Sequence, residues 1–248
     1  MRREVKTKVK KRTFNCLFRQ NGETYQLFVN DAIKRKDWDG EASDTSATYF
    51  AEKLGEIPEG ATLEIHINSE GGDAYEGTAI YNLLKAAPIR KVGIVDGRCF
   101  SAATFILMAC DERVMNTGTN LLVHNAWTIA MGNADELRAV ADDLDKLMES
   151  NRKIFMERCE MSEEDLISLM KAEKLLTPEE ALEYGFIDSI GGQAKAEEPA
   201  EEPEEAEPED EQPEEIPEEE PEDEEPEEAQ AIRSDRYEAA ERFFKQYF

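Results

Sequence analysis

The sequence is poor in the side chains that bind metal ions or form disulfides. Among its 248 residues are two histidines and four cysteines, and no two cysteines have the CxxC spacing of a zinc or redox motif. These counts argue against a metal site and favour reduced, unpaired thiols. No apolar run approaches the roughly 18 residues of a membrane-spanning helix, and no apolar segment follows the basic start MRREVKTKVKKR. We therefore expect a soluble cytoplasmic protein that is neither secreted nor inserted in a membrane.

Basic side chains are missing from one long stretch near the end of the chain. Residues 197–228 hold 21 acidic side chains, seven of the ten prolines, and no lysine or arginine. Such a composition cannot bury enough apolar surface to offset the entropy of an ordered chain. Residues 193–228 are therefore predicted to be a disordered acidic linker. Without residues 197–228, the net charge of −28 falls to about −7, so the acidity belongs to the tail and not to the folded part.

The two ends of the chain differ from this linker. Residues 1–23 are interpreted as a basic arm that is solvated or contacts nucleic acid, an acidic partner or the acidic tract itself. Residues 229–248 regain basic and aromatic side chains at helical spacing, behind a possible capping box of Asp235 and Glu238. We expect an amphipathic helix there, which either docks on a partner or packs back on the folded domain. The folded domain is assigned to residues 24–192.

Strands and helices are predicted to alternate through this domain. The apolar patterns and turn residues indicate strands over residues 24–29, 63–67, 92–95, 112–115 and 121–124. They indicate helices over residues 44–54, 75–86, 101–110, 133–153, 163–171 and 178–184. Asp44 or Ser46 is available to cap the first helix, and Pro88 ends the second. This alternation predicts an α/β fold with a parallel sheet and surrounding helices.

Three turns that follow predicted strands carry residues suited to catalysis, namely Gly71-Gly72, Ser101 and His124. In parallel sheets, ligands collect at the carboxyl ends of the strands, so these turns are expected to open on one edge of the sheet. The Gly-Gly pair is either a simple turn or a source of uncovered backbone N–H groups for an oxyanion.

Ser101 and His124 are the candidates for nucleophilic catalysis. A serine hydroxyl is a weak nucleophile until a neutral histidine accepts its proton, and a carboxylate normally orients that histidine. Ser101 begins an apolar helix, where it is either a helix cap or a nucleophile near the positive end of the helix dipole. His66 alternates with polar residues inside a strand and is interpreted as structural. Cys99 is a weaker rival nucleophile, because its surroundings are apolar.

Four segments together resemble a known family. The segments HINSEGG, DGRCFSAATFILMACDERVM, LLVHNAW and LLTPEEALEYGFID follow one another between residues 24 and 190. They are similar to the Clp-type serine proteases, in the variant that tailed phages encode as the prohead, or capsid maturation, protease. The resemblance implies the ClpP/crotonase α/β fold and no cofactor. Glu70 departs from the family pattern, which has proline at this position.

The resemblance also implies roles for individual residues. Ser101 would be the nucleophile and His124 the general base. The backbone N–H groups of Gly72 and Ala102 would form the oxyanion hole, and the Gly71-Gly72 backbone would bind the substrate.

The third member of the triad aligns with Glu173, just before LLTPEEA. The housekeeping Clp peptidases use an aspartate in this role, and glutamate supplies the same carboxylate. Asp111 and Asp188 are lesser candidates, because each lies beside the end of an element that it could simply cap.

The function implied by the resemblance is that of a serine endopeptidase that cleaves scaffold and capsid proteins during phage head maturation. We expect a homo-oligomer, with a ring as one arrangement, that associates with the procapsid and has no membrane or specific nucleic-acid partner. Three alternatives stay open. They are a general ClpP-like peptidase working with an ATPase, a crotonase-like enzyme that holds a thioester enolate, and a non-catalytic capsid assembly or scaffold factor.

Overall fold

A computed structural model describes residues 16–22, 24–36 and 43–191. Its centre is a seven-stranded sheet in the order β1-β2-β3-β4-β5-β7, with β6 paired to the end of β4. β1 and β2 are antiparallel, and the neighbours from β2 to β7 are parallel. The strands are β1 Cys16–Asn21, β2 Thr24–Val29, β3 Thr62–Ser69, β4 Arg90–Phe100, β5 Glu112–Asn116, β6 Asn120–Leu122 and β7 Ser189–Gly191. The predicted α/β fold with a mostly parallel sheet is confirmed.

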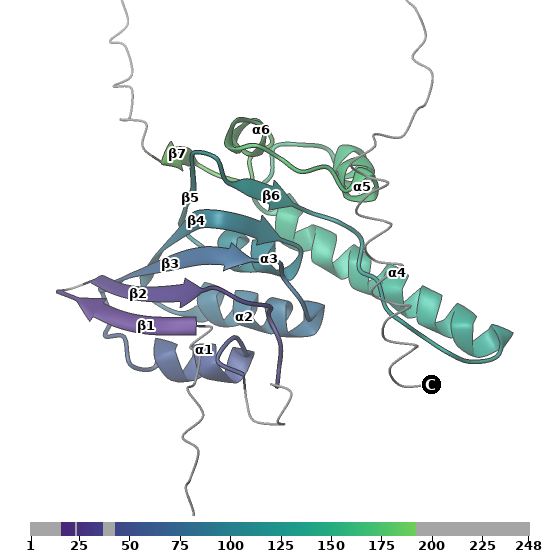
Figure 1. Cartoon of the computed structure of the whole chain (residues 1–248), viewed down its shortest axis with the longest axis horizontal. Helices are drawn as coiled ribbons and strands as arrows, with labels where there is room; N and C mark the ends of the chain where they lie inside the picture. Colours follow the sequence, from purple (N-terminus) through teal and green to yellow (C-terminus); the bar gives the residue numbers. More distant parts are fainter. Residues whose placement is uncertain (1–15, 23, 37–42, 192–248) are drawn as a thin grey trace, which may run out of the picture. The chain divides into compact units, whose positions relative to one another are not determined.

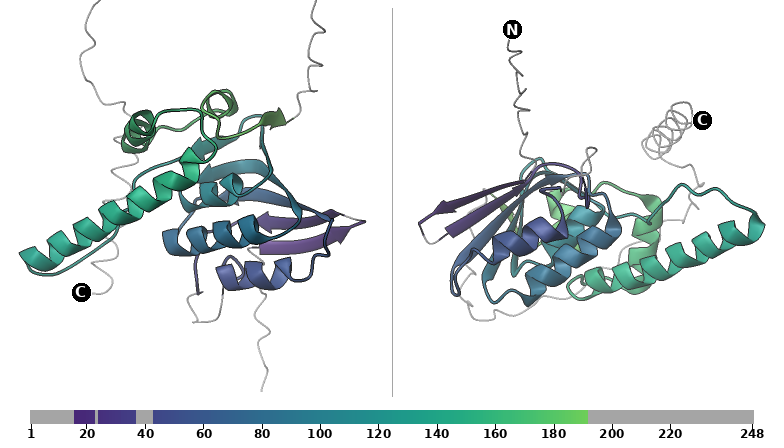
Figure 2. Two further views of the ribbon diagram at one scale, coloured as in Figure 1. Left: turned by 180° about the vertical axis from the view of Figure 1, so that it is seen from behind. Right: turned by 90° about the horizontal axis from the view of Figure 1, so that it is seen from below.

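The helices cover one face of this sheet and extend from one side of it. They are α1 Ala47–Leu54, α2 Ala74–Ala86, α3 Ala102–Met108, α4 Ala134–Met156, α5 Glu163–Ala172 and α6 Pro178–Glu183. α1, α2 and α3 lie on the same face of the sheet (Figure 1), and the view from behind shows them in front of the strands (Figure 2). α4 is the longest helix and projects away from the sheet in both figures.

The sequence explains where these elements begin and which side they bury. In β3, Leu63, Ile65 and Ile67 are at most 1% exposed and face the helices, while the residues between them are more exposed. Ser46 caps α1, as predicted, since its side chain accepts a hydrogen bond from the Tyr49 backbone. The residues of α3 are all buried, in agreement with the prediction of an interior helix.

The first strand of the sheet was missed by the sequence analysis. Residues 1–23 were assigned to an arm, but Cys16–Asn21 forms β1 and pairs with β2. The signal was the dipeptide Asn21-Gly22, which is typical of tight hairpins, and Gly22 has a φ of 63°. Residues 1–15 of the predicted arm, the acidic linker and the predicted C-terminal helix lie outside the described residues.

β4 is longer than predicted, and this extension carries the chain to Ser101. The predicted strand ended at Val95 because Asp96-Gly97 resembles a turn, yet β4 continues to Phe100. The register against β3 shifts between Ile67 and Ser69, and this irregularity allows β4 to continue through Gly97 without ending. β6 then pairs with the last residues of β4. β7 was also missed, because three residues are too few to give a period.

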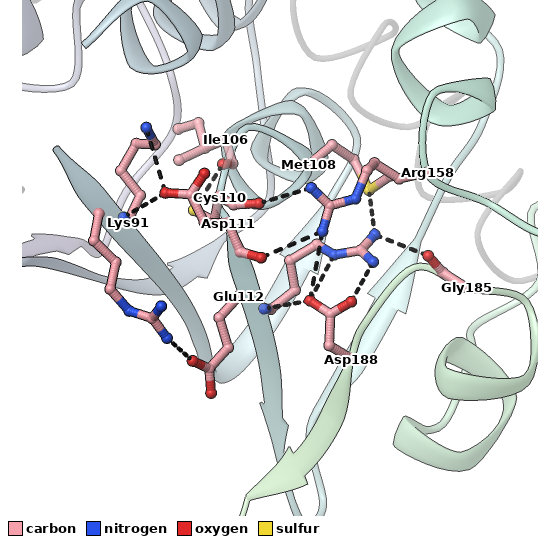
Figure 3. Close-up of polar contacts among 11 residues, drawn as sticks. Lys91, Ile106, Met108, Cys110, Asp111, Glu112, Arg158, Gly185 and Asp188 are labelled. Atoms are coloured by element: carbon pink, nitrogen blue, oxygen red, sulfur yellow. Dashed lines mark hydrogen bonds and ion pairs between the residues drawn. The ribbon is translucent and has the colours of Figure 1, made fainter. Parts of the chain in front are cut away.

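A network of ion pairs occupies the amino ends of β4 and β5 (Figure 3). Arg113 is buried, and its guanidinium binds both carboxylate oxygens of Asp188 at 2.6 and 3.0 Å. The Asp111 carboxylate accepts a hydrogen bond of 2.8 Å from the Lys91 backbone and lies 3.4 Å from the Lys91 ammonium. Arg158 lies 3.8 Å from Asp188. These carboxylates hold the sheet together at the end opposite to Ser101.

The Arg113 pair predicts a pH-dependent contribution of Asp188 to stability. Burial acts to raise the pKa of Asp188, but the hydrogen bonds and charge of Arg113 outweigh burial and lower it. A lowered folded-state pKa stabilises the fold above the unfolded pKa of about 4, and this contribution is lost as the pH falls through the folded pKa. We expect Asp188→Asn to lower the free energy of unfolding at pH 7 by about 1–3 kcal/mol, because it leaves the buried Arg113 charge without its partner.

Urea unfolding of both proteins from pH 7 down to pH 3 measures this effect. The difference between wild type and Asp188→Asn should shrink as the pH falls. Asp143→Asn is the matched control, because Asp143 forms an ion pair with Lys146 in which both side chains are about three-quarters exposed. That variant should lie within about 0.5 kcal/mol of wild type. An Asp188→Asn effect of equal size at pH 3 and pH 7 would contradict the assignment.

Candidate active site

Ser101 sits at the sharp turn between β4 and α3. Its φ of 54° and ψ of −128° are unusual for a residue other than glycine, and its side chain makes no capping hydrogen bond to α3. Ser101 thus occupies the N-cap position of α3, but its hydroxyl is not used in capping. Its own backbone N–H donates to the Leu122 carbonyl at 2.8 Å, which ties the turn to β6. The serine side chain is presented at the carboxyl end of the sheet, beside the start of a helix.

His124 lies two residues beyond the end of β6, in a pocket that it shares with Ser101. The pocket is lined by Ser101, His124, Asn151 and apolar side chains that include Phe105, Met148 and Phe155. The side chain of His124 is only 8% exposed. The topology thus brings two predicted residues to one place, although 22 residues lie between them in the sequence.

Glu173 reaches the same histidine from α5. Its carboxylate Oε1 lies 3.9 Å from His124 Nδ1, an ion-pair distance that is longer than a hydrogen bond. Glu173 ends α5 in the left-handed conformation, with a φ of 51°. The segment that follows is fixed by two backbone hydrogen bonds between Leu121 and Leu176, at 2.8 and 3.0 Å. These two hydrogen bonds connect the segment after Glu173 to β6, the strand that precedes His124.

The Gly71-Gly72 turn packs directly against Ser101. A Cβ atom on Gly71 would lie 2.7 Å from the Ser101 Cβ and 2.8 Å from the Ala102 nitrogen, so only glycine fits. Gly72 is equally confined on its other side, because its Cβ would lie 2.2 Å from the Ile33 carbonyl oxygen. The glycine turn and the serine turn, which the sequence could only suggest were neighbours, are in contact.

The hydrogen bonds of this turn determine which way Gly72 faces. Ile33 donates to the Gly71 carbonyl at 2.7 Å and accepts from the Asp73 N–H at 2.8 Å, which is the pattern of a parallel bridge between Ile33 and Gly72. The N–H and C=O of Gly72 itself therefore point away from Ile33. Among the hydrogen bonds of the described residues, none has the N–H of Gly72 or Ala102 as its donor. Both amides are available to an oxyanion.

The other residues considered for catalysis do not line this pocket. Cys99 is completely buried, and burial raises the pKa of its thiol, which keeps it protonated and unreactive. His66 lies on β3 with its Nδ1 2.8 Å from Asp96 and its ring stacked on Phe28, consistent with a structural role. Asp111 and Asp188 belong to the ion-pair network at the amino ends of the strands (Figure 3).

Some residues of the site gave little signal in the sequence. Asn151 is a buried polar residue on the apolar side of α4, and a polar position within that apolar stripe was the available hint. Ser69 and Ile33 support the Gly-Gly turn from a strand end and a loop, and no local pattern links them. The described residues contain no group of three or more His, Cys, Asp and Glu side chains arranged to hold a metal ion.

The folded domain matches a known protein family over most of its length. A model of the family described as Clp protease matches residues 40–194, which is more than half of the chain. The chain belongs to the Clp protease family. Every residue placed at the site above, apart from Ile33, lies within the matched range.

Two curated members of the Clp protease family are similar to this chain. The ATP-dependent Clp protease proteolytic subunit of Deinococcus radiodurans is 28% identical over 137 residues, which cover 54% of this chain and 66% of that protein. The ATP-dependent Clp protease proteolytic subunit 2 of Treponema denticola is 30% identical over 137 residues, covering 54% and 68%. The chain therefore spans about two thirds of the length of these relatives.

A solved structure supports the fold. A point mutant of ClpP1 from Listeria monocytogenes superimposes with a TM-score of 0.57 at 19% sequence identity, covering 66% of this chain and 90% of that one. At this identity the likeness concerns the fold alone. Within the described residues, every helix is too short or too polar to cross a membrane.

Proposed function

We propose that the chain is a serine endopeptidase that works through an acyl-enzyme. The observation that carries this proposal is that Ser101 shares one pocket with His124 and is in contact with the Gly71-Gly72 turn. Membership of the Clp protease family supports it. No cofactor is needed, because the serine, the histidine and the backbone amides supply a nucleophile, a proton acceptor and an oxyanion hole.

In this mechanism, the Ser101 hydroxyl attacks the scissile carbonyl while His124 accepts its proton. Glu173 lies on the Nδ1 side of the imidazole and stabilises the positive charge that develops there. The N–H groups of Gly72 and Ala102 bind the oxyanion of the tetrahedral intermediate. His124 then gives its proton to the leaving amine. A water molecule, deprotonated by His124, releases the acyl group from Ser101 and restores the enzyme.

The substrate is proposed to bind as an extended strand beside Gly72. The N–H and C=O of Gly72 face away from Ile33, so they can pair with a peptide in the manner of an added strand. The side chain before the cleaved bond would enter the pocket next to Ser101, whose walls are mainly apolar. We therefore expect cleavage after apolar residues of moderate size.

We also propose that the chain works as a homo-oligomer, of which a ring is one form. Large apolar side chains are exposed before and at the start of α4, including Trp127 at 58%, Met131 at 67% and Leu137 at 43%. Exposed apolar side chains that lie close together are typical of surfaces that contact a partner. The names of the Deinococcus and Treponema relatives describe them as subunits of a larger protease.

For the biological substrates, we propose the scaffold and capsid proteins of a tailed phage, processed in association with the procapsid inside the bacterial cell. The support is the resemblance to prohead proteases, together with the acidic tract of residues 197–228, which would tether a docking segment at residues 229–248. The alternative, a peptidase fed by an ATPase, is favoured by the names of the relatives, which describe ATP-dependent enzymes.

These roles are separated by incubating the purified chain with the capsid and scaffold proteins encoded beside it, without ATP, and mapping new termini by mass spectrometry. Defined new termini support head maturation. Cleavage that appears only with an ATPase and ATP favours the alternative. A scaffold factor without activity would cleave nothing in either arm.

A crotonase-like enzyme is a different class of function for the same fold. It would use the paired amides to hold a thioester enolate and has no need of the pair formed by Ser101 and His124. A fluorophosphonate separates the two classes, because it reacts with an activated serine and leaves an acyl-CoA enzyme unmodified.

The first prediction concerns the nucleophile. We expect Ser101→Ala and His124→Ala each to lower peptide cleavage on the order of a million-fold while the fold is retained, because the two residues act as a unit. Ser150→Ala is the matched control, since Ser150 is an exposed serine on α4 that hydrogen-bonds to its own helix. Cys99→Ala should keep its activity. Full cleavage by a folded Ser101→Ala protein would reject the proposed nucleophile.

A second prediction concerns the carboxylate. Glu173→Gln keeps the size of the side chain and removes its charge, so the imidazolium loses its stabilising partner. We expect kcat to fall roughly a thousand-fold. Asp111→Asn and Asp188→Asn, assayed below their unfolding temperatures, should retain most of their activity because both carboxylates lie at the other end of the sheet. If either of them were crippled while Glu173→Gln stayed active, another carboxylate would be the third member.

A further inference from the structure

The Ser69 side chain is buried at the point where β3 ends and the glycine turn begins. It is 1% exposed, and its hydroxyl makes two hydrogen bonds. It donates to the Asp31 carbonyl at 2.7 Å and accepts from the Gly71 N–H at 3.1 Å. A single oxygen therefore connects the loop before Ile33 to the first glycine of the turn.

The loop of residues 31–33 holds the glycine turn at three points. Ser69 links it to the Gly71 N–H, and Ile33 binds the carbonyl of Gly71 and the N–H of Asp73. The Gly71 N–H, the Gly71 carbonyl and the Asp73 N–H, which flank Gly72, are thus all bound to Ser69 or to Ile33. Only the N–H and C=O of Gly72 are left to face the other side.

We infer that Ser69 is a positioning residue for the oxyanion hole, an inference that rests on the proposed protease function. The Ser69 hydroxyl accepts the hydrogen bond of the Gly71 N–H, so this amide does not compete with the Gly72 amide for the oxyanion. The same hydroxyl fixes the loop of residues 31–33, along which Gly72 is aligned. The hydrogen bonds of the Ser69 hydroxyl go to Asp31 and Gly71, and none joins it to Ser101 among the described residues. It acts through the direction of the Gly72 N–H, which must point at the position that the oxyanion will occupy.

A purely structural role would have different consequences. Loss of a buried hydroxyl leaves the Gly71 N–H and the Asp31 carbonyl unpaired, which destabilises any fold to some extent. If stability were the only role, the folded fraction of a Ser69→Ala protein would react at the wild-type rate. A positioning role predicts a slower reaction at Ser101 with little change in substrate binding, because the oxyanion exists only in the transition state.

The test compares wild type, Ser69→Ala and Thr119→Val. Thr119 is a matched control, since it is 4% exposed and its hydroxyl donates a hydrogen bond of 2.7 Å to the Asn116 carbonyl, in a turn that does not contact Gly71. The rate of fluorophosphonate labelling of Ser101 is measured together with kcat and KM for hydrolysis of p-nitrophenyl acetate. For Ser69→Ala we expect labelling and kcat to fall roughly tenfold to a hundredfold with KM almost unchanged. Thr119→Val should react like wild type.

Hydrogen exchange at the amides of Gly71 and Gly72 provides a readout that does not depend on catalysis. The Gly71 amide should exchange faster in Ser69→Ala than in wild type, and Ser69→Thr, which keeps the hydroxyl, should restore both protection and labelling. If Ser69→Ala does not fold, the comparison is made with Ser69→Cys, whose thiol is a weaker hydrogen-bonding group.

Failure of this inference can be told apart from failure of the proposed function. A wild-type protein that does not react with the fluorophosphonate would overturn the protease function and the oxyanion hole with it. A reactive wild type together with an equally reactive, folded Ser69→Ala protein would overturn the role of Ser69 alone. Equal losses in Ser69→Ala and Thr119→Val would also reject it, because any buried hydroxyl would then have the same effect.

Discussion

The candidate site depends on a contact between two backbones that leaves no room for a side chain. Gly71 lies against the junction of β4 and α3, where its Cβ would come within 2.4 Å of the Phe100 carbonyl oxygen. Gly72 meets the same limit at Ile33. The turn is held between two segments of main chain, so only glycine fits at either position, and the hydrogen bonds to Ile33 fix the direction of the Gly72 amide. The irregular register of β3 and β4 matters because it sets this spacing.

The parallel sheet assigns different tasks to its two ends. The segments that follow β3, β4 and β6 carry the proposed catalytic groups, and the N–H groups of Gly72 and Ala102 there donate no hydrogen bond among the described residues. At the amino ends, the buried Arg113 forms an ion pair with the more exposed Asp188, which holds β5 to the segment before β7. Carboxylates at this second end are bound to cations and serve stability. Of the three carboxylates considered for the triad, Asp111 and Asp188 lie at this end, and Glu173 lies near His124.

The fold class was predictable from the sequence, because it depends on local patterns, and alternating strands and helices indicated the parallel sheet. Ser101 and His124 were candidates because they follow predicted strands, whereas Glu173 was suggested only by the resemblance to the Clp-type proteases. What could not be predicted was anything that depends on contacts between distant residues. β1 is ordered by its pairing with β2, and β4 continues through Asp96-Gly97 because Asn68 and β6 pair with it. The role of the Ser69 hydroxyl could not be predicted, because its partner, the Asp31 carbonyl, lies in a loop distant in the sequence.

Ser101 and Glu173 are the two residues other than glycine that have a positive φ in the described part of the chain. An L-residue held in such a conformation costs about 1–3 kcal/mol, and glycine relieves most of that cost. The proposed nucleophile and the proposed third member of the triad therefore both oppose the conformational preference of their own backbone. Selection for thermal stability alone would favour glycine or asparagine at these two positions and would remove the chemistry without disturbing the fold. A stabilised version of this protein has to be selected for activity at the same time as for melting temperature.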